Sequence, residues 1–204
     1  MRVPILAEWG WSHDAQLLWR PFAGYRALAA TPAGARAALL GLFRWCVVIA
    51  CFVSLTTAGR LLLDHLLFAP LGWAFAPVAQ TLCVIATARV VKAKLPTTKL
   101  LELYFAGHAP WFVLLVLIAG VCLFAPEPQL ALRFFVGTGI GFALVLAAIV
   151  WCCFLTYAMF RTGVGLGRGA AALASALFYV GYAGTLVGYF LVTGQLLPLF
   201  GRFS

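Results

Sequence analysis

The chain has 204 residues, of which 65% are hydrophobic and 9% charged; its formal net charge is +9 and its mean hydropathy +1.05. Soluble domains carry about 25% charged residues, so this composition excludes a soluble globular protein. Only helices and closed barrels satisfy every backbone polar group in hydrocarbon, and the apolar runs lack the alternation of barrel strands. We therefore expect an all-α fold, a polytopic membrane helical bundle.

Residues 1–38 are predicted to form a cytoplasmic amphipathic segment that lies at the membrane interface. Aromatic and apolar residues such as Trp19 and Phe22 interleave there with Arg20 and Arg26. This pattern is typical of helices that bury one face in the headgroup region. A soluble partner could cover the same residues, so the pattern alone leaves both bilayer and protein contact open. No cleavable signal peptide is expected, because no continuous apolar region opens the chain.

Residues 39–200 are predicted to form a domain of five transmembrane helices. Crossing about 30 Å of hydrocarbon takes about 20 apolar residues, and five uncharged runs approach or exceed that length. In the second run, Pro70 and Pro77 remove two backbone donors, which predicts a kink or an irregular outer half. The expected spans are about 40–62, 66–88, 100–124, 130–160 and 169–193.

The basic residues predict the orientation of these spans. When the polar breaks are assigned alternately to the two sides, three arginines fall on one side, namely Arg60, Arg133 and Arg202. The positive-inside rule then predicts a cytoplasmic N-terminus and an outside C-terminus. An arginine-rich composition with abundant Ala, Gly and Leu is typical of a GC-rich genome and suggests a bacterial cytoplasmic (inner) membrane. The other eleven basic residues are Arg2, Arg20, Arg26, Arg36, Arg44, Arg89, Lys92, Lys94, Lys99, Arg161 and Arg168.

This positive charge is divided among three cytoplasmic segments instead of forming one patch. Division of this kind favours contact with anionic lipid headgroups and disfavours nucleic acid. The densest basic stretch is the loop 89–99. The candidate contacts with lipid or with a protein partner are Arg20, Arg26, Arg89, Lys92, Lys94 and Lys99.

Glu102 and His108 form the candidate intramembrane polar site, since an ionisable residue within a span suggests function. They are six residues and about 9 Å of helical rise apart, and the helix places them on different faces. A shared metal or a simple proton pair is therefore disfavoured. Structural roles are the alternative: Glu102 could pair with Arg89, Lys92 or Lys99, and His108 could bond a carbonyl freed by Pro110.

The sequence contains few parts for catalysis or for a cofactor. Its six cysteines all fall within predicted spans and form no CxxC pair, while its three histidines lie at different depths. Haem ligation, metal binding and a disulfide framework are therefore disfavoured. With five carboxylates and no nucleophile–base arrangement, we expect no enzyme activity and no cofactor.

Four glycines are predicted to mediate helix packing. Gly137 with Gly141, and Gly184 with Gly188, have the small-xxx-small spacing that lets two helix backbones approach closely. We expect them to pack the fourth span against the fifth, with contact to a second subunit as the alternative.

The sequence resembles the Yip1-domain family of five-span membrane proteins. The resemblance lies in the segment Trp19-Arg-Pro-Phe-Ala-Gly-Tyr-Arg-Ala-Leu28, in the five spans with a cytoplasmic N-terminus, and in Leu101-Glu-Leu-Tyr-Phe-Ala-Gly-His-Ala-Pro110. It implies a non-catalytic membrane protein; eukaryotic members of that family engage small GTPases in vesicle traffic.

These observations predict a non-catalytic scaffold or adaptor that organises membrane proteins and touches anionic lipids. One alternative is an accessory structural subunit of a larger energy-converting or secretion complex. A second alternative is a small transporter that uses Glu102, His108 and the kinked second span.

Overall fold

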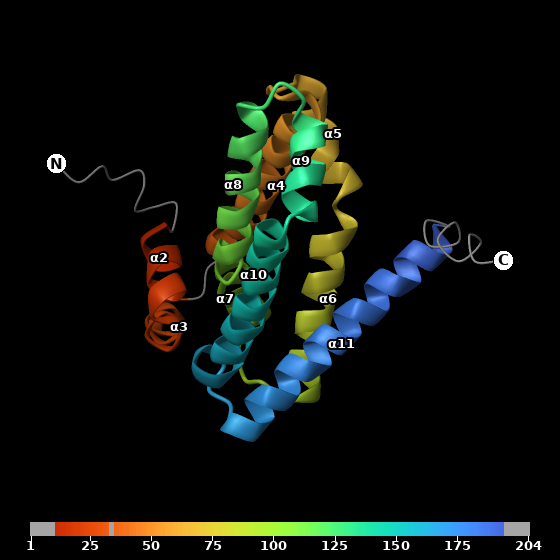
Figure 1. Ribbon diagram of the computed structural model, residues 1–204. Helices are drawn as coiled ribbons and strands as arrows, with labels where there is room; N and C mark the ends of the chain where they lie inside the picture. Colours follow the sequence, from red (N-terminus) through yellow and green to blue (C-terminus); the bar gives the residue numbers. More distant parts are fainter. Residues whose placement is uncertain (1–10, 33–34, 194–204) are drawn as a thin grey trace.

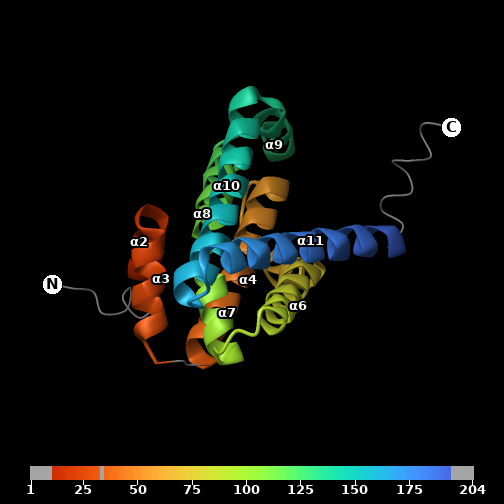
Figure 2. The ribbon, with the colours of Figure 1, turned by 90° about the horizontal axis from the view of Figure 1, so that it is seen from below.

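The structure is a computed structural model that describes residues 11–32 and 35–193, and every regular element in those ranges is a helix (Figure 1). The first described elements are two short helices, α2 (Trp11–Trp19) and α3 (Pro21–Ala30), which lie beside the bundle in both ribbon views (Figures 1 and 2). Pro21 occupies the first turn of α3, where a missing N–H costs no hydrogen bond. Leu17 and Tyr25 are buried against the bundle, whereas Trp19 is 85% exposed.

Four helical segments are long and apolar enough to cross a membrane. A fifth passage exists if α7 (Thr97–Ala106) and α8 (Ala109–Leu123), which are bent by 41° relative to each other, count as one span. The all-α, polytopic character of the chain is thereby confirmed. The four segments run over Arg36–Ala58, Leu63–Val90, Gly139–Gly163 and Arg168–Val192. They correspond to α4 (Ala35–Ala58), α5 (Leu63–Gly72) with α6 (Phe75–Val90), α10 (Gly139–Ala158) with the π-helical turn η1 (Met159–Gly163), and α11 (Arg168–Val192).

The turn between α4 and α5 is held by one buried hydroxyl. Ser54 is fully buried; its Oγ donates to the carbonyl of Arg60 and accepts from the N–H of Leu62, both at 2.8 Å. Gly59 adopts φ +65°, a left-handed conformation that glycine enters without steric cost. The backbone groups freed at the end of α4 are thus satisfied inside the turn.

The predicted irregularity of the second passage is confirmed. Helices α5 and α6 are separated at Trp73 and Ala74, between Pro70 inside α5 and Pro77 in the first turn of α6. The N–H of Trp73 still bonds the carbonyl of Ala69 at 3.0 Å, so the interruption is local. The chain therefore continues along the bundle after the break (Figure 1).

The segment expected as one span over about 130–160 is instead two helices, α9 (Pro128–Gly137) and α10. Thr138 is extended, with ψ 150°, and its Oγ accepts from the N–H of Gly141 at 3.1 Å while donating to the Phe135 carbonyl at 2.8 Å. Helix α9 packs on α4 and α8. A threonine N-cap between glycines stops the helix, although the run of apolar residues continues.

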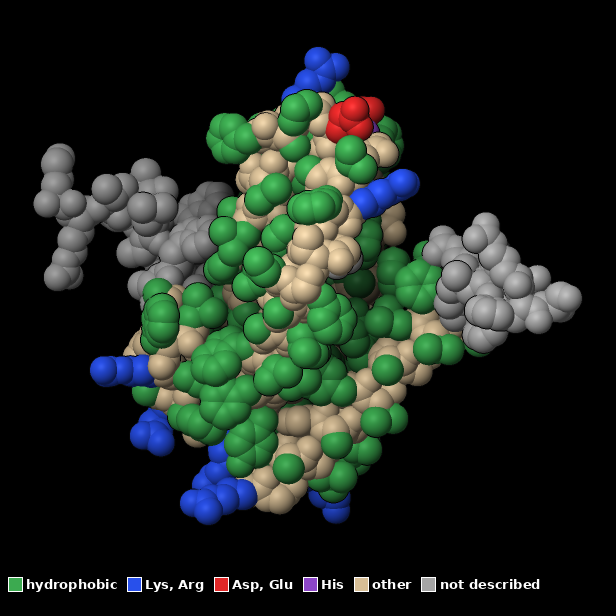
Figure 3. Space-filling model, viewed as in Figure 1, with side chains coloured by type: hydrophobic (Ala, Val, Ile, Leu, Met, Phe, Trp, Pro, Cys, Tyr) green, Lys and Arg blue, Asp and Glu red, His purple; other side chains and the backbone are tan. Residues whose placement is uncertain are grey.

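The largest buried core lies where α3, α7, α10, η1 and α11 meet, around Tyr25, Leu103, Phe160 and Phe178. Beyond it the helices expose many large apolar side chains, which appear in green over much of the face shown in Figure 3. A water-soluble protein rarely exposes apolar surface of this extent, so these faces are suited to lipid. Helix α11 crosses the bundle diagonally against α6, and its first half contributes its buried residues Ala171, Ala174 and Phe178 (Figures 1 and 2).

Candidate functional site

Lys and Arg side chains gather around the end of the bundle where α3, the α6–α7 connection and the start of α11 lie (Figures 1 and 3). Five of the six predicted contact residues are exposed, at this end of the bundle or between α2 and α3: Arg20, Arg26, Arg89, Lys92 and Lys94. They are available to headgroups or to a partner.

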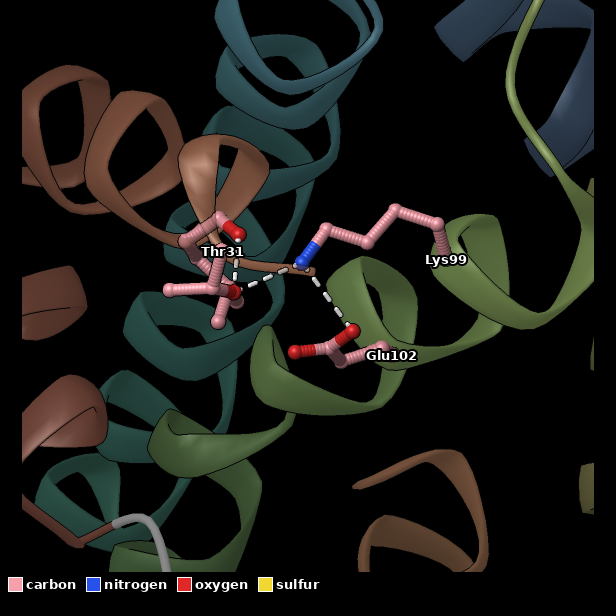
Figure 4. Close-up of polar contacts among 4 residues, drawn as sticks. Thr31, Lys99 and Glu102 are labelled. Carbon is pink, nitrogen blue, oxygen red and sulfur yellow. Dashed lines mark hydrogen bonds and ion pairs between the residues drawn. The ribbon is translucent and has the colours of Figure 1, made fainter. Parts of the chain in front are cut away.

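Lys99 differs from these five because its side chain is only 3% exposed. Its Nζ lies 3.1 Å from Oε2 of Glu102 and donates to Oγ1 of Thr31 at 2.8 Å (Figure 4). Thr31 Oγ1 in turn donates to the carbonyl of Leu28 at 2.7 Å. This buried cluster removes Lys99 from the predicted contact set, because a headgroup or a partner cannot reach its ammonium.

The cluster joins two parts of the chain that are far apart in sequence. Thr31 follows α3, whereas Lys99 and Glu102 stand one turn apart on α7. The pairing expected for Glu102 with a basic residue of 89–99 is therefore confirmed, with Lys99 as the partner. An ion pair with an added hydroxyl acceptor fastens the end of α3 to the third passage.

His108 occupies a different place, at the junction of α7 and α8. Its Nδ1 lies 3.2 Å from the carbonyl oxygen of Tyr104, and its Nε2 lies 3.2 Å from Oε1 of Gln80 on α6. Since a carbonyl oxygen only accepts, Nδ1 carries the proton. In the neutral imidazole, Nε2 accepts a hydrogen bond from the NH₂ group of Gln80 when that group faces the ring. In the imidazolium form, Nε2 donates to the amide oxygen of Gln80.

The predicted bond from His108 to a carbonyl freed by Pro110 is wrong. Pro110 lies in the first turn of α8, where a helix has no hydrogen bond to lose. The helix has already ended at Ala106, with Gly107 as its C-cap, so the imidazole bonds the Tyr104 carbonyl instead.

His108 lines an interior cavity of about 520 Å³ between α4, α6, α8, α10 and α11. Ligand-binding cavities commonly measure about 300–1,000 Å³, so a small organic molecule fits this one. Its walls are largely aromatic, and Glu102 is not among the lining residues. The two residues predicted as one polar site therefore serve two separate places. The aromatic lining residues are Tyr25, Trp45, Phe52, Trp73, Tyr104, Trp111, Phe112, Phe178, Tyr179 and Tyr182.

Two polar contacts complete the lining and were missed by the sequence analysis. Gln80 on α6 and Tyr182 on α11 both line the cavity and interact electrostatically across it. Thr156 on α10 contacts the hydroxyl of Tyr179 at 3.0 Å. Gln80 is the one amide within the uncharged run 66–88, a signal that the ionisable residues alone do not give.

The cavity has an apolar mouth and a polar inner end. Trp73 and Ile149 in its lining are 47% and 42% exposed, whereas His108 and Phe112 are 7% and 5% exposed. The surface is hollowed between α10 and α11 on the face shown in Figure 3. Because the surrounding exposed side chains are apolar, this opening faces the region that suits lipid tails.

The four predicted packing glycines do not pack α10 against α11. A Cβ at Gly137, Gly184 or Gly188 would meet no other described atom within 4 Å. A Cβ at Gly141 would overlap the carbonyl oxygen of Phe135, at the junction of α9 and α10. Gly181 is the α11 glycine that lies against another helix, with Sγ of Cys83 on α6 at 3.7 Å from its Cβ position. Contact of the outer glycines with a second chain stays a prediction.

The long apolar helices, the lipid-suited faces and the interior cavity define this chain as a polytopic α-helical membrane protein. Within the described ranges, no three His, Cys, Asp or Glu side chains cluster in a way that could hold a metal ion. No family model, no curated protein and no solved structure matches the sequence or the fold. The likeness to the Yip1-domain family therefore stays a prediction.

Proposed function

We propose that the protein is a non-catalytic integral membrane protein that holds a small apolar molecule in its interior cavity. The observation that carries this proposal is the 520 Å³ cavity, with its aromatic walls, its few convergent polar groups and its mouth on the apolar surface. A ligand dissolved in the bilayer would enter sideways between α10 and α11. The separation of Glu102 from His108 favours binding over a transport path that uses both residues.

The proposal includes an orientation in a bacterial cytoplasmic membrane. If α7 and α8 form one span, the five passages would leave the connections at 91–96 and 164–167 on the same side as α3. The positive-inside rule supports placing that side in the cytoplasm and the C-terminus outside.

Filling the cavity is expected to expel its ligand. Ala76 lines the cavity, and Ala76→Leu adds three carbon atoms to the space. Protein purified in nanodiscs would be extracted and the co-purifying small molecules measured by mass spectrometry. We expect the amount per protein to fall about tenfold, the effect of a loss of about 1.4 kcal/mol in binding.

The matched control is Ala143→Leu, which places the same side chain on an exposed face of α10. It should retain the wild-type amount. Equal loss in both variants, or no loss in either, would contradict the proposed binding function.

The exposed basic end favours a second candidate function, that of an adaptor or an accessory subunit of a larger complex. If the connection between α6 and α7 docks a partner, replacing Arg89, Lys92 and Lys94 by Gln should release a stoichiometric partner on native gels of solubilised membranes. The Arg60→Gln, Arg133→Gln variant alters charges near the opposite end and should leave the complex intact. Migration of the wild-type protein as a solitary chain in mild detergent would contradict this candidate.

A further inference from the structure

The chemistry of the cavity lining narrows the class of ligand, and this inference rests on the proposed binding function. None of the described residues that line the cavity is Asp, Glu, Lys or Arg. A cation inside the bundle would thus lose its hydration without gaining a counter-charge, which costs far more than burying a neutral molecule. The lining therefore favours a neutral occupant over a cation.

A cation held by the aromatic rings is disfavoured by a cation already present. The guanidinium carbon of Arg44 lies 5.6 Å from the ring centroid of Phe112, which belongs to the lining. A second positive charge near that ring would be repelled, whereas the negative end of a carbonyl dipole would be attracted.

The hydrogen-bonding groups of the lining are richer in donors than in acceptors. Trp45, Trp73 and Trp111 can only donate, and the tyrosine hydroxyls can donate or accept. The lining contains no carboxylate to receive these protons. A ligand that supplies acceptor oxygens and no acidic proton matches such a site.

We propose that the cavity binds an uncharged, flat ring compound whose carbonyl oxygens accept hydrogen bonds from Tyr182 and Gln80, a compound of the quinone type dissolved in the bilayer. The ring lies between aromatic walls, where offset stacking and edge contacts favour planar molecules. Gln80 lies 3.2 Å from Nε2 of His108 at the polar inner end, and Tyr182 lies close enough to interact with Gln80.

Two ring compounds of nearly equal shape test this assignment. 2,3-Dimethyl-1,4-naphthoquinone has two carbonyl oxygens, and 2,3-dimethylnaphthalene has none. Full substitution of the quinone ring prevents addition of the Cys152 thiol, which lines the cavity. Ligand retained by protein in nanodiscs, in excess of that retained by empty nanodiscs, would be measured by chromatography over a range of concentrations.

We expect tighter binding of the quinone than of the hydrocarbon to the wild-type chain. Tyr182→Phe and Gln80→Leu should each weaken quinone binding about fivefold to tenfold, as the loss of one hydrogen bond does, and leave hydrocarbon binding unchanged. Tyr189→Phe is the matched control, because Tyr189 stacks on Phe75 outside the lining. It should bind the quinone as the wild type does.

Equal affinity for the two compounds, or equal loss of both in the Tyr182 and Gln80 variants, would overturn the assignment of a carbonyl ligand. Retention of N-methylquinolinium, a cation of similar size, at the level of the quinone would overturn the uncharged class. Failure of both ring compounds to bind would also reject the assignment. The proposed binding function is judged separately, by the co-purifying molecule in Ala76→Leu, and survives if only the ligand class fails.

Discussion

Glu102→Leu is expected to destabilise the protein by about 3–5 kcal/mol, because it leaves the Lys99 ammonium buried without its counter-charge. In the folded chain Lys99 and Glu102 are 3% and 10% exposed, so water cannot replace the lost partner without opening the packing around α7. Thr31 Oγ1 would remain as an acceptor for Lys99, but a hydroxyl carries no negative charge. Thermal unfolding in detergent, followed by circular dichroism, measures the change.

The double variant Lys99→Met, Glu102→Leu should recover most of the lost stability, since replacing both members of a buried pair by apolar residues is often neutral. Glu127→Leu removes a carboxylate from an exposed position and serves as the control. A single Glu102 variant as stable as the wild type would show that the pair does not stabilise the attachment of α3. Cavity binding should persist in the double variant, because neither residue lines the cavity.

Gly141→Ala is expected to disrupt the junction of α9 and α10. The added methyl group would overlap the backbone carbonyl oxygen of Phe135, which cannot move without breaking the turn that Thr138 holds. Overpacking of this kind costs about 1–3 kcal/mol, and the shift of a backbone carbonyl places this substitution at the upper end. The melting temperature in detergent reports the loss.

Gly184→Ala gives the opposite expectation and is therefore the matched control. Gly184 lies within α11 with no other described atom near its Cβ position, so alanine gains helix propensity of about 0.5–1 kcal/mol at no steric cost. A fall in stability for Gly184→Ala would indicate that this face contacts another chain. An unchanged melting temperature for Gly141→Ala would contradict the described turn.

The sequence predicted the apolar passages well because hydrophobicity is a local property. The uncharged runs lie close to the helices that could span a membrane, and Pro70 and Pro77 marked the interruption of the second passage. The break at Thr138 was missed, since the apolar run passes through it and a threonine N-cap is recognised only when the turn is known.

The arrangement of the polar residues could not be predicted from spacing along one helix. Lys99 belongs to the densest basic stretch, and only the return of Thr31 to α7 shows that its ammonium is buried. The polar groups of the cavity come from single residues on separate helices, such as Gln80 on α6 and Thr156 on α10. Neither residue stands out in the sequence of its own segment, and tertiary packing brings the two into one cavity.

The attachment of α3 implies an order for biogenesis. Tyr25 lies against Gly163 in η1, about 140 residues later in the chain. Lys99, which donates a hydrogen bond to Thr31, follows it by 68 residues. At about 5–20 residues per second, the ribosome delivers η1 about 7–28 s after α3. During that interval the amphipathic pair α2–α3 has no bundle to bind. It must therefore bind the membrane surface or a chaperone until the bundle has formed.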